Sequence, residues 1–235
     1  MNQYYAKIDQ GLLPTTSQPP LGDVLEAFEA YKDSEIIDIA MADGLSGTYQ
    51  TACGAREMSD HKERIHVFNS RTLCGPHRYM VQTAQKMKES GATAQEILTW
   101  LREAADNTES FLIPQDFSFL KRGGRLTPLA AATGSVLKLK PIMKLTKDGK
   151  RLDKFGIKRT MVSAAQSIID NLREKQLGSN HILYISHGNA PDDAAKISAL
   201  FRNTFQNLEV RILDLSAAFV AQGGPRCVAI QYIRR

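Results

Sequence analysis

The first half of the sequence alternates between strand-like and helix-like segments, and this alternation limits the available folds more than any other feature. Short apolar runs, typical of buried strands, are separated by longer segments with helical periodicity. The expected strands cover residues 35–42, 64–69 and 111–115, and the expected helices cover residues 21–32, 48–59, 77–90 and 94–106. Such alternation predicts an α/β fold, with a parallel sheet that has helices on both faces in a three-layer arrangement.

The second half of the chain follows a different pattern. Two strand-like runs, 135–146 and 150–158, are joined by Lys147-Asp148-Gly149, and Asp-Gly is a strong hairpin signal. We expect the remaining elements to be a helix over 159–176, a strand over 181–186, a helix over 190–205 and strands over 209–215 and 227–234. The sequence therefore predicts two domains: an α/β domain over residues 1–116, and a smaller α+β domain with a largely antiparallel sheet over residues 117–235.

The composition argues against several classes of protein. A chain of 235 residues that is 43% hydrophobic can bury a full core. Its three cysteines are widely spaced, which argues against a disulfide framework and is typical of a reducing cytosol. No apolar run approaches membrane-spanning length, and the N-terminus does not read as a signal peptide. We therefore expect a cytoplasmic protein without stable membrane insertion. The five histidines lack the spacing of a metal site.

A candidate anion site lies at Asp43-Gly44-Leu45-Ser46-Gly47, between an expected strand and an expected helix. The strand over 35–42 is apolar enough to be buried on both faces. The first N–H groups of a helix are unpaired and favour negative charge, and Ser46 and Thr48 add hydroxyl donors. The other interpretation is an ordinary helix start, with Ser46 as its N-cap.

A second hydroxyl-rich segment, Thr15-Thr16-Ser17-Gln18-Pro19-Pro20, precedes the first expected helix. Its prolines favour extended geometry, so the hydroxyls are presented on a stiff loop. This segment also has a second interpretation, a plain capping loop with proline near the helix start. Polar residues 69–72 follow another expected strand, just as the Ser46 loop does. Ligands of open parallel sheets bind at these carboxyl ends.

The expected hairpin carries a dense set of basic residues. They are Lys138, Lys140, Lys144, Lys147, Lys150, Arg151, Lys154, Lys158 and Arg159. This pattern is typical of a docking face for an acidic partner, or of a sheet edge that lysines protect from pairing. Because Phe155 is the one aromatic residue in this region, base stacking has little support and we expect no nucleic-acid partner.

Signatures of catalysis are weak in this sequence. The Gly123-Gly124 pair is more typical of a turn than of a phosphate loop, because the Walker A and GxGxxG patterns are absent. Cys74 and His77 are close enough for a Cys–His pair, but no third group is identified to orient them. His187 is not accompanied by a nucleophile elbow. We therefore predict no catalytic residue.

Several short motifs occur in a fixed order along essentially the whole chain. They are Pro14-Thr-Thr-Ser-Gln-Pro19, Gly44-Leu-Ser-Gly-Thr-Tyr-Gln-Thr-Ala52, Asn69-Ser-Arg71, Phe119-Leu-Lys-Arg-Gly-Gly-Arg-Leu126, Leu139-Lys-Pro-Ile142, Asp148-Gly149, His187 near Pro191-Asp-Asp-Ala194, and Gly224-Pro225. This series resembles the DegV family of bacterial fatty-acid-binding proteins. The resemblance implies two α/β domains that hold a long-chain fatty acid between them, with its acyl chain in an apolar tunnel. It also favours the anion-site interpretation of Ser46.

The resemblance implies a set of head-group ligands. Family members hold the carboxylate with a threonine of the TTSQP loop and the serine of the LSGT loop, which correspond to Thr16 and Ser46. The predicted site is completed by Thr15, Ser17, Gly47, Thr48 and Gln222. The expected ligand is a fatty acid such as palmitate, stearate or oleate, and no metal or other cofactor is implied. The protein is then a carrier and not an enzyme. It presents the carboxylate to a fatty acid kinase, which phosphorylates it with ATP.

The sequence also departs from the family pattern. Family members usually have a longer N-terminus with a further strand before the TTSQP loop. Ala42-Asp43 replaces the usual Ser-Ser, Asn69 replaces an aspartate, and Gln222 stands where histidine is usual. These departures keep open a second function, a diverged regulatory or interaction protein that does not bind lipid. A third interpretation, which ATP binding by the isolated chain would favour, is a small-anion or nucleotide-binding enzyme.

Overall fold

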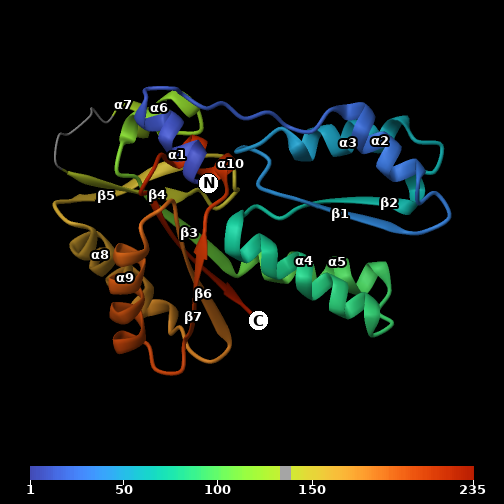
Figure 1. Ribbon diagram of the computed structural model, residues 1–235. Helices are drawn as coiled ribbons and strands as arrows, with labels where there is room; N and C mark the ends of the chain where they lie inside the picture. The colour runs from blue at the N-terminus through green and yellow to red at the C-terminus, as the bar shows by residue number, and fades with distance from the viewer. Residues whose placement is uncertain (133–138) are drawn as a thin grey trace. The chain divides into compact units, whose positions relative to one another are not determined.

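The computed structural model describes residues 1–132 and 139–235, and its contacts divide the chain into two compact units. The six-stranded unit contains Met1–Thr16, Thr108–Thr146 and Arg151–Arg235. The two-stranded unit contains Ser17–Asn107 and Lys147–Lys150. Figure 1 labels the helices and strands of both units.

The two-stranded unit is built on a short parallel sheet. In chain order its elements are α2 (Leu21–Glu29), β1 (Ile36–Ala40), α3 (Thr48–Met58), the 3-10 turn η1 (Lys62–Arg64), β2 (Ile65–Asn69), α4 (Cys74–Glu89) and α5 (Ala94–Asp106). β1 and β2 pair from Ile36 opposite Ile65 to Ala40 opposite Asn69. Because the strands are parallel, the chain leaves both of them at the same edge.

The burial of β1 differs from the expectation. Residues 35–42 were expected to form a strand buried on both faces, but within β1 only Ala40 is fully buried and the other four residues are partly exposed. The prediction was wrong because the buried cluster beside this sheet is small, and Ile36 of β1 is only partly buried against it. A small core of Phe28, Ala52, Ala55 and Ile65 nevertheless joins α2 and α3 to the sheet.

The six-stranded unit contains a mixed sheet with helices. In chain order its elements are α1 (Asn2–Asp9), β3 (Thr108–Ile113), α6 (Phe117–Gly123), α7 (Pro128–Ala132), β4 (Lys140–Leu145), β5 (Leu152–Lys158), α8 (Met161–Leu172), the 3-10 turn η2 (Arg173–Lys175), β6 (His181–His187), α9 (Pro191–Thr204), β7 (Glu209–Asp214), α10 (Ala217–Gly223) and β8 (Val228–Arg234). The strand order is β5-β4-β3-β8-β6-β7. Among the described strands of this sheet, β6 and β7 pair in parallel and the other neighbours pair antiparallel, so the sheet is largely antiparallel, as predicted.

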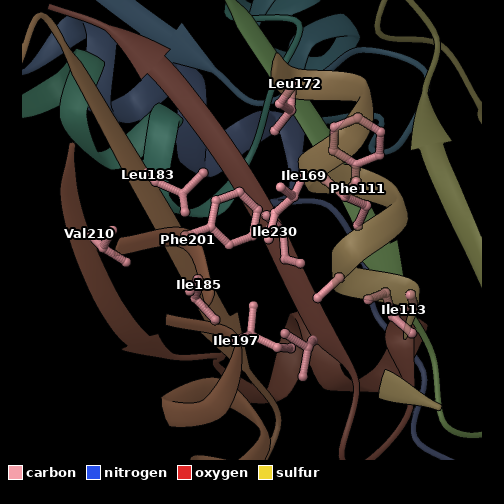
Figure 2. Packing of buried hydrophobic residues seen from close by; sticks show 14 of the residues in the cluster. Phe111, Ile113, Ile169, Leu172, Leu183, Ile185, Ile197, Phe201, Val210 and Ile230 are labelled. Atoms are coloured by element: carbon pink, nitrogen blue, oxygen red, sulfur yellow. The ribbon is translucent and has the colours of Figure 1, made fainter. Parts of the chain in front are cut away.

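The core of this unit lies between α8, α9 and one face of the sheet (Figure 2). On α8 the buried side chains recur at helical spacing from Met161 to Leu172, which gives the helix one continuous apolar face. Ile169 of α8 and Phe201 of α9 pack in the same cluster as Ile230 of β8. This packing explains why the long periodic segments of the second half are helices.

The mixed α/β class is confirmed, with three differences in detail. The strand expected over 111–115 was grouped with the first parallel sheet, but β3 pairs with β8 and β4 in the mixed sheet. The mixed sheet, expected in the smaller part of the protein, has more strands than the parallel one. The short helices α1, α6, α7 and α10 were not predicted. The domain division at residue 116 stays a prediction.

The predicted hairpin is present. β4 and β5 pair antiparallel on either side of Lys147-Asp148-Gly149. Part of the strand expected over 135–146 and Lys138 of the basic set lie outside the described residues. Within the described part of the chain, no helix is both long and apolar enough to cross a membrane.

Candidate functional site

The loop after β1 (residues 41–47) joins β1 to α3. The LSGT loop (residues 45–48) lies at the end of this connection and carries a pair of hydroxyl groups. The Oγ of Ser46 lies 2.8 Å from the Oγ1 of Thr48, and it also accepts the Thr48 N–H at 3.3 Å. The N-cap of α3 is Gly47, which has no capping side chain. Ser46 therefore does contribute to the helix start, but from the position before the N-cap.

The hydroxyl pair is suited to binding an anion. Two hydroxyls that share one hydrogen bond use one O–H between them, so the second O–H can donate to another acceptor. This donor lies at the start of an 11-residue helix, where the peptide dipoles favour negative charge. The cap and the anion-site interpretations are thus compatible.

The loop after β1, which contains the LSGT segment, is hydrogen-bonded to the loop that follows β2. The Oδ1 of Asn69 accepts the N–H of Asp43 at 3.3 Å and the N–H of Arg71 at 3.0 Å. The Ala42 N–H donates to the Thr72 carbonyl at 2.8 Å. Asn69 therefore joins the two loops through one side-chain oxygen.

The carboxylate of Asp43, three residues before Ser46, has a hydrogen-bond partner. Its Oδ1 accepts from the Nε2 of Gln50 at 3.0 Å. This bond directs the Asp43 carboxylate toward a side chain in the first turn of α3.

Gln18 connects the TTSQP loop (residues 15–19) to the LSGT loop. A Cβ on Gly47 would lie 1.6 Å from the Oε1 of Gln18, so Gly47 leaves space that this amide uses. Gln18 was not predicted as a site residue because it has no hydroxyl. The signal that could have found it was Gly47, since glycine is often required where another group approaches the backbone closely.

Thr16 and Gln222 are brought together within the six-stranded unit, although 206 positions separate them. The Nε2 of Gln222, near the end of α10, donates to the Oγ1 of Thr16 at 2.9 Å. Because this bond occupies Thr16 as an acceptor, the O–H of Thr16 can donate to another group. The Oε1 of Gln222 lies against Gly123, where a Cβ would be 2.3 Å away.

The remaining predicted site residues are exposed. Thr15 lies in the six-stranded unit and Ser17 begins the two-stranded unit, so the TTSQP loop crosses from one unit to the other. The structure thus groups Ser46, Gly47 and Thr48 in one unit, and Thr16 with Gln222 in the other. Their role in head-group binding stays a prediction.

The other candidate groups have structural roles. The Nε2 of His77 donates to the Ile39 carbonyl at 2.7 Å, which fixes α4 to β1. Gly124 has a φ of 69° and ends α6, which confirms the turn interpretation of the glycine pair. The His187 Nδ1 accepts the Ala190 N–H at 3.3 Å. Across residues 1–132 and 139–235, no cluster of three or more His, Cys, Asp or Glu side chains is arranged to hold a metal ion.

Comparisons with known proteins agree with one another. A family model described as "Uncharacterised protein, DegV family" matches residues 1–235. A DegV domain-containing protein of Halalkalibacterium halodurans is 33% identical over 214 residues, which cover 89% of this chain and 75% of the relative.

Two solved structures are similar over nearly the whole chain. The fatty-acid-binding protein DegV of Bacillus subtilis superposes with a TM-score of 0.82 at 28% identity, over 99% of this chain and 83% of that one. A DegV family protein of Ruminococcus gnavus, refined with vaccenic acid, superposes with a TM-score of 0.86 at 22% identity, over 98% and 83% of the two chains.

Proposed function

The chain belongs to the DegV family, and from this premise we propose that it binds one long-chain fatty acid and presents the carboxylate to a fatty acid kinase. The ligand is a fatty acid such as palmitate, stearate or oleate, and no metal takes part. The protein itself is a carrier and not a catalyst, so the phosphoryl transfer belongs to the partner. The fatty acids bound by its structural relatives support this assignment.

The observation that carries the proposal is the hydroxyl pair of Ser46 and Thr48 at the start of α3. A carboxylate accepts hydrogen bonds only, so it suits a site that offers an O–H donor beside a helix N-terminus. Hydrogen bonds to an ionised group are also stronger than those between neutral groups.

Thr16 supplies the second hydroxyl in this proposal. Gln222 occupies the acceptor side of Thr16, so the Thr16 O–H remains available as a donor. Thr15 and Ser17 are further donors on the same loop. The acyl chain contributes most of the affinity, since each buried methylene is worth about 0.8 kcal/mol.

The test is the substitution Ser46→Ala. Loss of a hydrogen bond to a charged group is expected to weaken oleate binding by about 10- to 100-fold, without unfolding the protein. Calorimetric titration with oleate measures the affinity, and thermal unfolding checks the fold.

Thr93→Ala is a matched control for this substitution. Thr93 also places a hydroxyl at a helix start, where it accepts the Glu96 N–H, but it lies at α5. We expect this variant to lose stability and to bind oleate as the wild type does. Unchanged oleate affinity in folded Ser46→Ala would remove Ser46 from the site.

A further inference from the structure

The tip of the β4–β5 hairpin is unusual in being buried at its centre. Hairpin tips normally face solvent. Here Lys147, Asp148 and Lys150 are exposed, but Gly149 between them is buried. The tip, Lys147–Lys150, is grouped with the two-stranded unit. Main-chain packing within that unit accounts for the buried glycine.

Two glycines allow this packing. A Cβ on Gly44 would lie 2.0 Å from the carbonyl oxygen of Lys150 and 2.2 Å from its Cα. A Cβ on Gly149 would lie 2.9 Å from the Cα of Arg71. The tip therefore touches the loop after β1 through Lys150 and the loop after β2 through Gly149. Each contact involves backbone, so neither can be relieved by a side-chain rotation alone.

The tip has an internally fixed shape. The Asp148 Oδ1 accepts the Lys150 N–H at 3.0 Å, which closes a turn within the tip. Below it, the Thr146 N–H donates to the Arg151 carbonyl at 2.9 Å, and the Arg151 N–H donates to the Thr146 hydroxyl at 3.1 Å. The tip can therefore support the two loops as a preformed element.

We infer that the hairpin tip Lys147–Lys150 is a positioning element that holds the Ser46 and Thr48 hydroxyls in the orientation that recognises a carboxylate. Gly44, which contacts Lys150, lies two residues before Ser46 in the same loop. The loop after β2, which contacts Gly149, is joined to this loop through Asn69. The inference rests on the proposed function, because it assigns the tip a role in head-group selection.

The test compares two alanine substitutions that impose similar backbone strain. Gly149 and Gly91 both have positive φ, 72° and 88°, but a Cβ at Gly91 would meet no atom within 4 Å. Gly149→Ala therefore adds a clash with the loop after β2, whereas Gly91→Ala adds only the strain of the left-handed conformation. The difference between the two variants isolates the contact of the tip.

The readout is the ratio of the affinities for oleate and oleyl alcohol, which share an acyl chain and differ in the head group. For Gly149→Ala we expect this ratio to fall about tenfold while the alcohol affinity stays within about threefold, because the head-group bonds are lost and the chain contacts are kept. Gly91→Ala should keep the wild-type ratio. An unchanged ratio in Gly149→Ala, or an equal fall in both variants, would overturn the inference.

A second measurement does not depend on lipid. Amide hydrogen exchange at Ser46 and Thr48 should become faster in Gly149→Ala and should stay unchanged in Gly91→Ala. If Gly149→Ala fails to fold, replacement of Lys147–Lys150 by a two-residue Asn-Gly turn removes the contact instead. A wild-type protein that binds no oleate would refute the proposed function. If the wild type binds oleate, and Gly149→Ala changes neither the amide exchange of the loop nor the affinity ratio, the positioning role alone is refuted.

Discussion

Gln222 would give the proposed head-group site a neutral amide. An amide cannot become cationic, so the affinity for a fluorescent fatty acid should change little between about pH 6 and 8. Gln222→His should make binding tighter as the pH falls through about 6.5, because the imidazolium then attracts the carboxylate. Titrations across this range measure the effect. The same pH dependence in both proteins would show that Gln222 does not act near the head group.

Cys227 has a thiol that is fully buried, and burial raises its pKa to about 12. Above about pH 9 the unfolded chain loses the thiol proton while the folded chain keeps it. The contribution of this thiol to the free energy of unfolding is therefore constant below about pH 9. Between about pH 9 and 12 it falls by about 1.4 kcal/mol per pH unit. Cys227→Ser, whose hydroxyl does not titrate here, should have a shallower alkaline slope in urea unfolding. Identical slopes would contradict the buried assignment.

Single residues of the site differ in how far the sequence could predict them. Ser46 and Thr48 follow from local patterns, because a strand, a glycine turn and a helix start are all visible within about ten residues. The Thr16–Gln222 bond was not predicted, since nothing local links positions 206 apart. Gln222 entered the predicted site only through the family resemblance. Gln18 was missed because its role depends on the space left by Gly47.

At the scale of elements, the capping box of α5 is a clear case of local control. The Thr93 Oγ1 accepts the Glu96 N–H at 3.3 Å, and the Glu96 carboxylate accepts the Thr93 N–H at 2.8 Å. The Thr93 N–H and the Thr93 hydroxyl both donate to the Glu96 carboxylate, and these two bonds lower the pKa of that carboxyl. Thr93→Ala should reduce the free energy of unfolding by about 1 kcal/mol, measured by urea denaturation. No loss of stability would mean that packing alone determines where α5 begins.

Elements with strong local signals were predicted and elements set by distant contacts were not. The helices α5, α8 and α9 have long apolar faces or caps, and all three match their expected positions closely. The helices α6 and α10 have seven residues each, too short for a periodic pattern, and they pack against each other. β3 was recognised as a strand, but its partner β8 lies more than a hundred positions away, and no local pattern specifies that pairing.

At the scale of the whole molecule, the family relation joins features that local reasoning leaves separate. Each motif alone has an ordinary structural explanation, such as a cap, a turn or a protected sheet edge. Their order along the chain is what distinguishes a DegV protein, and the full-length family match agrees with it. A carrier function then requires that the folded chain retain a lipid through purification.

The most direct measurement of this claim is native mass spectrometry of the freshly purified protein, with organic extraction to identify any bound molecule. We predict one fatty acid per chain, whose mass gives its length and unsaturation. A protein that is free of lipid, and stays free after incubation with a panel of saturated and unsaturated fatty acids, would contradict the carrier function. Intact folding in the same sample, checked by thermal unfolding, would make that contradiction decisive.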